Sequence, residues 1–184
     1  MTTAQQQDVV DLLKSQHEQI KSLFSQIKSA QGTQKRDRFH ELVRLLAVHE
    51  TAEEQVVHPE ARQSAGDQVI QARLREEKEA KQALSELYDM GVDNPQFDSK
   101  MDAFAKAVIE HAEREEREEF PKLREQVSND RLRQMAAAVG AAERMAPTRP
   151  HPKAGESATA NMLAGPPLAI FDRARDAIRD RRER

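Results

Sequence analysis

The sequence contains no cysteine and no tryptophan among its 184 residues. Without cysteine the chain can form neither a disulfide nor a thiolate metal site, so any metal ion must be bound through nitrogen and oxygen atoms. Aromatic residues make up only 4 % of the chain and there are only six glycines, whereas 33 % of the residues are charged. This balance favours helices over a β-sheet. We therefore expect an all-α protein.

Long apolar runs and a strong net charge are also missing. No stretch is long and apolar enough to span a membrane, and the N-terminal MTTAQQQDVV lacks the apolar core of a signal peptide. The net charge of −3 is too small to argue for a nucleic-acid partner. We expect a cytoplasmic protein that contacts neither a membrane nor a nucleic acid.

Helical periodicity is present in four long segments, at about 5–30, 35–62, 67–90 and 97–127. The connections between them are short, so neighbouring helices should be antiparallel. An up-down-up-down four-helix bundle over residues 1–127 is the expected fold. Pro59 lies inside the second segment and should kink or end its last turn.

The remainder of the chain divides into three parts. Residues 128–145 have the pattern of an additional helix that packs on the bundle. Residues 146–167 are rich in Pro, Gly, Ala and Ser, which predicts a flexible linker. Residues 168–184 form a short amphipathic segment in which arginines alternate with acids. We expect a docking or solvated helix there, and binding of a protein partner through this tail is one of its candidate roles.

One pattern of His, two Glu and Pro occurs twice in the chain. His49 and Glu53 recur as His111 and Glu115, each pair followed at the same offset by a proline. Positions i and i+4 lie on the same face of a helix. Each copy therefore places an imidazole beside a carboxylate, which is how helical bundles hold metal ions. A single such pair is expected by chance in a sequence so rich in acids, but its recurrence on two apolar faces is not.

Six polar residues occupy positions on the apolar helix faces where Leu or Ile would be expected: His17, His49, Glu53, Glu77, His111 and Glu115. Burying unpaired carboxylates is costly, and two divalent cations would compensate their charge. Glu53 and Glu115 come from opposite hairpins and are the natural bridging ligands. Nitrogen and oxygen ligands without sulfur suit iron or manganese, and zinc is an alternative.

The remaining polar residues have simpler interpretations. We expect His40 and His58 at the surface, with a supporting position beside the site as the alternative for His58. Tyr88, the single tyrosine, should belong to the core or its rim. The acids near the two motifs should form solvated faces: Glu50, Glu54, Glu116, Glu118 and Glu119.

With these residues the chain resembles the hemerythrin-like, or HHE cation-binding, family over residues 8–127. The family's order is a His on the first helix, His-x-x-x-Glu on the second, a His on the third and His-x-x-x-Glu on the fourth. Position 77 departs from it, with Glu in place of His. Lys81 and Glu116 stand where the oxygen-carrying members have a second His and an Asp. The resemblance implies a bacterial, actinobacterial-type member with two non-haem iron ions, joined by an oxo or hydroxo bridge.

Glu77 also bears on function. A carboxylate in place of an imidazole makes the predicted site harder and more anionic, which stabilises ferric iron and disfavours reversible oxygen binding. The resemblance then favours a di-iron protein that binds or reacts with peroxide or dioxygen in oxidative-stress defence. Catalase-like breakdown of peroxide is one reaction that such a protein would carry out. The alternative is a non-catalytic module that senses iron, oxygen or nitric oxide and signals to a protein partner. A metal-free interaction protein is the third hypothesis. Ferritin-like Glu-x-x-His and zincin His-Glu-x-x-His spacings do not occur on these faces.

Overall fold

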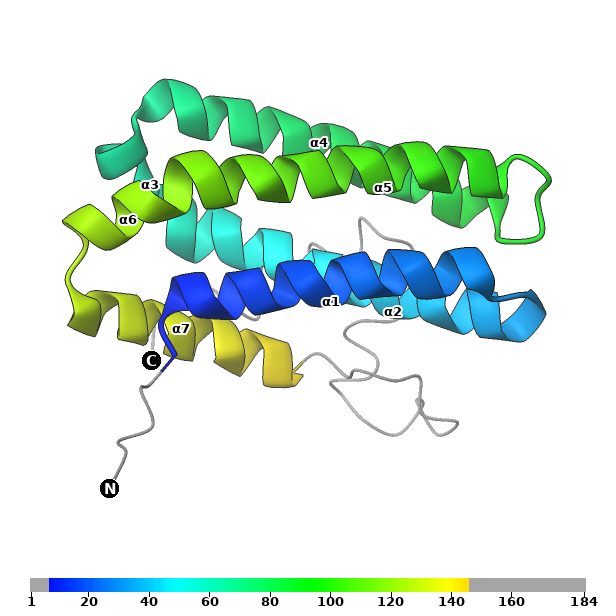
Figure 1. Cartoon of the computed structure of the whole chain (residues 1–184), viewed down its shortest axis with the longest axis horizontal. Helices are drawn as coiled ribbons and strands as arrows, with labels where there is room; N and C mark the ends of the chain where they lie inside the picture. Colours follow the sequence, from blue (N-terminus) through cyan, green and yellow to red (C-terminus); the bar gives the residue numbers. More distant parts are fainter. Residues whose placement is uncertain (1–6, 146–184) are drawn as a thin grey trace.

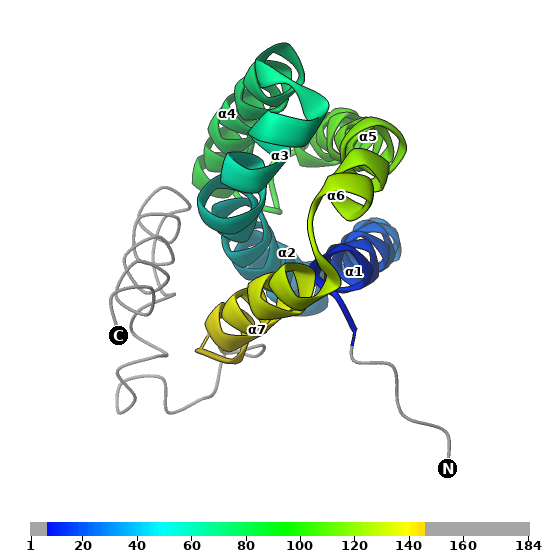
Figure 2. The ribbon, with the colours of Figure 1, turned by 90° about the vertical axis from the view of Figure 1, so that its left-hand side faces the viewer.

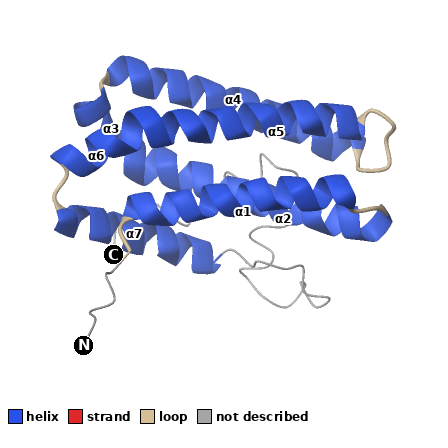
Figure 3. Ribbon diagram, viewed as in Figure 1, coloured by secondary structure: helices blue, strands red, loops and turns tan. Residues whose placement is uncertain are grey.

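The computed structural model describes the backbone of residues 7–145 and the side chains of residues 7–140. Helices account for nearly all of this range, and no strand occurs within it (Figure 3). The predicted all-α class is confirmed. None of the described helices combines the length and the apolar character that crossing a membrane requires. The predicted linker 146–167 and the predicted helix 168–184 lie outside the described residues.

Four long helices form the body of the molecule: α1 (Val9–Ser29), α2 (Gly32–Ala52), α4 (Asp67–Met90) and α5 (Phe97–Arg114). α1 packs against α2, and α4 packs against α5, so each pair is a helical hairpin. α1 also contacts α5, which closes the two hairpins into a bundle (Figures 1 and 2). The predicted helical bundle is therefore present.

Each hairpin of two long helices is followed by a short helix, and the two short helices lie at the same end of the bundle. α3 (His58–Ala65) follows α2, and α6 (Phe120–Gln126) follows α5. The two short helices contact each other and lie side by side in the end view (Figure 2). They belong to the equivalent parts of the two repeats, so the repeated sequence motif becomes a repeated structure.

A widened π-helical turn connects each long helix to its short successor. The first π-turn spans Glu53–Val57 and the second spans Glu115–Glu119. Each is closed by an i→i+5 hydrogen bond, from the His58 N–H to the Glu53 carbonyl and from the Phe120 N–H to the Glu115 carbonyl. Such turns are rare and occur mainly at functional sites.

The two prolines explain where these π-turns lie. Pro59 and Pro121 occupy the first turn of α3 and of α6, where a missing backbone N–H breaks no hydrogen bond. The sequence predicts that Pro59 kinks or ends the last turn of its helix. The helical path instead continues to Ala65, and the distortion that proline requires is taken up by the π-turn just before it.

A final described helix, α7 (Asn129–Met145), packs across α1 and α2 on the outside of the bundle (Figure 2). Its buried side chains Leu132, Met135 and Val139 follow the spacing of a single helix face. α7 also contacts the first π-turn. The helix thus lies along the side of the first hairpin, near the segment that begins at Glu53.

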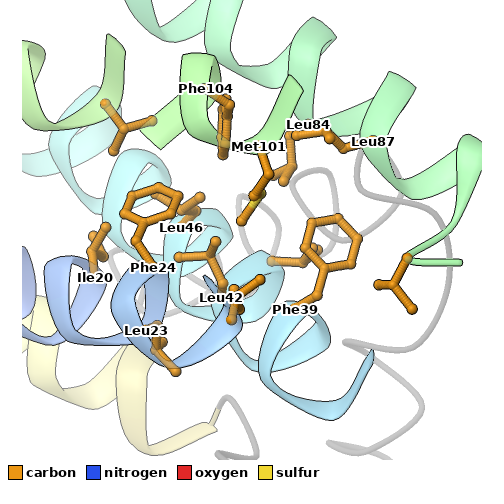
Figure 4. Close-up of a cluster of buried hydrophobic side chains, with 14 of the residues drawn as sticks. Ile20, Leu23, Phe24, Phe39, Leu42, Leu46, Leu84, Leu87, Met101 and Phe104 are labelled. Carbon is orange, nitrogen blue, oxygen red and sulfur yellow. The ribbon is translucent and has the colours of Figure 1, made fainter. Parts of the chain in front are cut away.

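Two apolar clusters make up the core. The first lies between the four long helices and includes Phe24, Phe39, Leu42, Leu84 and Phe104 (Figure 4). The second lies toward α3, α6 and α7 and includes Val9, Leu13, Val57, Phe120, Leu123 and Met135. The buried polar residues at 16–17, 49–53, 73–77 and 111–119 come from the parts of the helices that run between these clusters. The bundle therefore holds a polar layer between two apolar ones.

Candidate metal centre

The six residues singled out from the sequence meet in the polar layer. Two groups of four can each offer one ligand atom per residue, with all four atoms within 4.8 Å of one another. The first group is His17, His49, Glu53 and Glu115, and the second is Glu53, Glu77, His111 and Glu115. Every predicted site residue belongs to at least one group, and Glu53 and Glu115 belong to both.

Helix geometry explains how each motif presents its pair. The Nε2 atom of His49 lies 3.4 Å from a carboxylate oxygen of Glu53. The Nε2 atom of His111 lies 3.1 Å from a carboxylate oxygen of Glu115. Both glutamates are the first residues of the π-turns. The i, i+4 spacing thus works as the sequence suggests, at the last ordinary turn before each helix widens.

The two shared carboxylates are buried among histidine nitrogens, without hydrogen bonds of good geometry to their oxygens. Glu53 and Glu115 are both 0 % exposed, and none of their four carboxylate oxygens accepts a hydrogen bond from the described residues. A buried carboxylate left in this way costs several kcal/mol or changes its protonation, on the order given by transfer data. Three imidazoles and three carboxylates around these oxygens are a donor set that suits iron, manganese or zinc. The residues present therefore fit a pair of divalent cations.

Charges within the cluster shift its pKa values in opposite directions. Burial raises the pKa of Glu53 well above its usual value, and the neighbouring Glu115 adds to the effect. Burial also disfavours the ionised form of Glu115, but attraction to His111 outweighs it and holds the pKa of Glu115 well below its usual value. Burial, together with His17, depresses the pKa of His49. His49 is therefore neutral, as a metal-binding imidazole must be.

His111 behaves differently from His49. Burial disfavours its charged form, but the adjacent Glu115 outweighs that effect and raises the pKa of His111 to about 11. Without a cation in the cluster, the His111 imidazolium neutralises Glu115. A bound metal ion would take over this neutralising role and displace the proton from Nε2.

Each of the three histidines has its outer nitrogen fixed by a hydrogen bond. The Nδ1 atoms of His17, His49 and His111 each lie 2.8 Å from an oxygen, of Glu116, Gln16 and Glu76 respectively. When the imidazole is neutral, as it is for His49, a donating Nδ1 leaves the Nε2 lone pair directed at the centre. His111 would present this lone pair only after losing its Nε2 proton to a bound metal ion. Metal-binding histidines are usually held in this way. The Nε2 atoms of His17 and His49 are only 3.1 Å apart. At this distance either one ring donates a proton to the other or a cation lies between them.

The supporting role of these three residues was not predicted from the sequence, although each is adjacent in sequence to a predicted site residue. Adjacent positions differ by about 100° around a helix. A residue beside an inward-facing ligand therefore points toward the neighbouring helix. Gln16 of α1 reaches His49 of α2, and Glu76 of α4 reaches the histidine of α5. Glu116, expected on a solvated face, is partly buried and reaches from the second π-turn to α1.

His58 and Glu119 are the clearest corrections to the sequence interpretation. Glu119 was expected on a solvated face and His58 at the surface, but His58 is 2 % exposed and Glu119 is 0 % exposed. The burial of His58 agrees with the alternative interpretation, a supporting position beside the site. His58 Nε2 donates to Glu77 Oε1 at 2.5 Å, and His58 Nδ1 donates to Glu119 Oε1 at 3.1 Å. Burial disfavours the imidazolium, but these two hydrogen bonds outweigh it and raise the pKa of His58 to about 10.

The π-turn is the physical reason for the error at His58. Counted along an ordinary helix, position 58 is half a turn away from His49, because nine residues at about 100° each end on the opposite face. The π-turn accommodates one extra residue, which rotates all later positions back by about 100°. His58 is thereby brought to the face that looks toward α4. The glutamate at 119 lies at the end of the other π-turn and is covered by the same contact.

Glu50 is a further correction, since it is 4 % exposed and not part of a solvated face. Burial, with a further contribution from the nearby carboxyl of Glu77, raises the pKa of Glu50 to about 8. Lys81 lies 3.9 Å from Glu50 and also contacts Glu54. This lysine therefore brings a cation to the acidic edge of the site. His40 and Tyr88 are half-buried and stack on each other against the first apolar cluster.

A pocket of about 450 Å³ leads from the surface between α4 and α5 to the site. Apolar side chains supply most of its surface, among them Ala80, Leu87, Phe104 and Val108, and charged side chains such as Lys100 and Glu110 also line it. Glu50, Glu77 and His111 also line it, and all three are buried. The pocket thus reaches the second group of four residues and gives a small molecule a way to that half of the cluster.

Comparison with known proteins agrees with this geometry. The family model described as the hemerythrin HHE cation binding domain matches residues 8–123. An uncharacterized hemerythrin-like protein of Schizosaccharomyces pombe is 25 % identical over 174 residues, which cover 92 % of this chain and 86 % of that protein. The crystal structure of a hemerythrin HHE cation binding domain-containing protein from Mycobacterium kansasii has a TM-score of 0.66 and 24 % identity, covering 75 % of this chain and 91 % of that one.

The chain also matches part of a longer protein. A protein of Nostoc sp. named DNA nickase is 26 % identical over 140 residues, which are 76 % of this chain. The chain spans only 40 % of the nickase.

Proposed function

We propose, from the premise that this chain belongs to the hemerythrin HHE cation-binding family, that it holds two non-haem iron ions and reacts with peroxide or dioxygen. The ligands would be His17, His49, Glu53, Glu77, His111 and Glu115, with an oxo or hydroxo bridge completing the centre. Its role would be oxidative-stress defence, and catalase-like peroxide breakdown is one form of it. The observation that carries the proposal is the pair of overlapping four-residue groups that share two buried carboxylates.

The protein's own residues would divide the work. Glu53 and Glu115 would hold both ions, because each belongs to both groups. The outer hydrogen bonds from His17, His49 and His111 would keep the imidazoles oriented. When bound, iron supplies the redox chemistry toward small oxygen compounds. Six protein ligands do not fill the coordination of two six-coordinate ions, so positions remain for a small ligand.

The pocket between α4 and α5 supports a reaction with a small external molecule. It reaches Glu77 and His111 of the second hairpin. Neither His17 nor His49 of the first hairpin lines it. A ligand entering there would meet the ion held by the second group. The largely apolar wall would limit the water that enters with it.

Iron analysis of purified protein, with absorption spectra before and after addition of peroxide, tests this function. We expect close to two iron ions per chain and a spectrum that changes with peroxide. Glu53→Ala should abolish both, whereas Glu113→Ala, which changes an exposed glutamate on the same bundle, should alter neither. Less than about one iron per wild-type chain, on protein expressed with ample iron, would contradict the di-iron centre.

A sensing function is the alternative, and one contact favours it. α7 packs against the first π-turn, which begins at Glu53. Binding of metal would change the charge on Glu53. The resulting change in the π-turn would pass through this contact to α7 and from there to a protein partner. Hydrogen exchange of the α7 amides with and without metal distinguishes the two functions. Metal-dependent protection of α7 combined with no peroxide turnover would favour sensing.

A further inference from the structure

The two repeats of the bundle differ at two positions that touch each other. His17 on α1 and Glu77 on α4 occupy equivalent places in the two hairpins. The residue just before each motif proline also differs, since His58 precedes Pro59 and Phe120 precedes Pro121. In both halves this residue is the first of its short helix, directly after a π-turn.

In one half an aromatic ring supports the histidine. The rings of His17 and Phe120 are stacked, with centroids 5.8 Å apart and planes inclined by 12°. Both side chains are buried, with 1 % and 2 % exposure. An imidazole has an apolar face that can pack on phenylalanine, and its nitrogens remain available at the ring edge. Phe120 therefore fixes the plane of His17 without competing for its nitrogens.

In the other half a histidine supports the glutamate. His58 Nε2 donates to Glu77 Oε1, while Glu119 accepts from the opposite nitrogen of the same ring. Glu77 Oε2 has no hydrogen-bond partner among the described residues. One oxygen of Glu77 is thus held, and the other is left for a cation. A phenylalanine at position 58 would leave both oxygens buried and unpaired, which is costly.

We infer that His58 is a positioning residue for Glu77, and that His58 and Glu77 form a matched pair replacing the phenylalanine and histidine of the other half. The inference rests on the proposed metal centre and concerns its second group, Glu53, Glu77, His111 and Glu115. His58 lies outside that group, so it acts through Glu77 and is not itself a ligand. The pair makes the two metal positions unequal, one supported by a stacked ring and the other by a hydrogen-bonded histidine and glutamate.

Exchange of the pair between the two forms provides the test. His58→Phe removes the donor, and Glu77→His alone places an imidazole against His58. The double variant with His58→Phe and Glu77→His rebuilds the arrangement of His17 and Phe120. His58→Gln retains a side-chain N–H donor. His40→Phe makes the same substitution at a histidine that stacks on Tyr88 outside the site.

Calorimetric titration of metal-free protein with Co²⁺ measures both sites without relying on activity, and the visible spectrum of the bound ion reports on its ligands. We expect two binding events for the wild type and for His40→Phe. His58→Phe should weaken one event by about 10–100-fold, the usual effect of removing a residue that orients a ligand, and leave the other unchanged. His58→Gln and the double variant should recover most of the lost affinity.

Several results would overturn the inference. Two unchanged events for His58→Phe would show that Glu77 needs no support, and equal weakening of both events would show a general structural role. A double variant no better than His58→Phe would contradict the matched pair. If His58→Phe does not fold, recovery of fold and binding in the double variant supports the pairing, and its absence contradicts it. A wild type that binds no Co²⁺ would instead refute the proposed function itself.

Discussion

Replacing Glu53 with methionine separates the stability of the bundle from its capacity to bind metal. Glu53 is fully buried and neither of its oxygens accepts a hydrogen bond from the described residues. Methionine has a similar length and no charge. Leaving a buried polar group unsatisfied costs about 1–3 kcal/mol, and replacing buried charges by apolar groups of similar volume is often stabilising. We therefore expect metal-free Glu53→Met to be more stable than the metal-free wild type by about 1–3 kcal/mol.

Metal should reverse this order. A ligand that binds only the folded protein at one hundred times its Kd adds about 2.7 kcal/mol of stability, and two ions add more. Glu53→Met removes a carboxylate shared by both groups and should gain little of this stabilisation. The wild type should then be the more stable protein when both are loaded. The same residue would lower the stability of the empty bundle and raise that of the occupied one.

Urea unfolding followed by circular dichroism measures both differences, once in a chelator and once with excess Mn²⁺. Glu113→Met serves as the matched control, because Glu113 is exposed, and should stay within about 0.5 kcal/mol of the wild type in both conditions. A Glu53→Met protein that is less stable than the wild type in the chelator would refute the argument from unpaired burial. Equal stabilisation of both proteins by Mn²⁺ would refute the role of Glu53 in holding metal.

Three further predictions follow from the described contacts. Glu76→Ala removes the oxygen that orients His111 and should lower metal affinity by about 10–100-fold in a metal titration. Ala83→Phe fills the pocket between α4 and α5; it should slow the reaction with peroxide roughly tenfold, equivalent to about 1.4 kcal/mol, while iron content measured on the same protein stays unchanged. Asp8 accepts hydrogen bonds from Arg124 at 2.8 and 2.9 Å; burial opposes this, but the arginine outweighs it and lowers the pKa of Asp8. The stability that this ion pair contributes is therefore present above the unfolded-state pKa of Asp8 and is lost as the pH falls through the folded-state pKa. We expect Asp8→Asn to lower the free energy of unfolding in urea by about 0.5–1 kcal/mol at pH 7, and not to change it in acid well below both pKa values.

The helices and the six convergent residues could be anticipated because both depend on local periodicity. Apolar spacing sets the face that each helix buries, and the doubled His-x-x-x-Glu pairs interrupt that face at equivalent points. Because the two pairs lie at equivalent points of two helices that face the same core, their four side chains are expected to meet at the same height along the bundle axis. His17 and Glu77 could be found in the same way, since each occupies an otherwise apolar position.

The π-turns could not be anticipated from helical periodicity, and they account for the main errors. One extra residue in a turn is invisible in sequence periodicity, yet it moves His58 from the expected surface into contact with Glu77. Pro59 and Pro121 were the available signal, because a helix that continues past a proline must distort just before it. The burial of Glu50 and Glu119 depends on contacts between helices, which no single-helix pattern contains.

The most direct test of the di-iron centre is anomalous diffraction at the iron absorption edge from crystals of the iron-loaded protein. The account predicts two peaks about 3.5–4 Å apart, a separation typical of two-metal sites. Both should lie between Glu53 and Glu115, one toward His17 and His49 and the other toward Glu77 and His111. A single peak, no peak, or peaks away from the two shared carboxylates would contradict it.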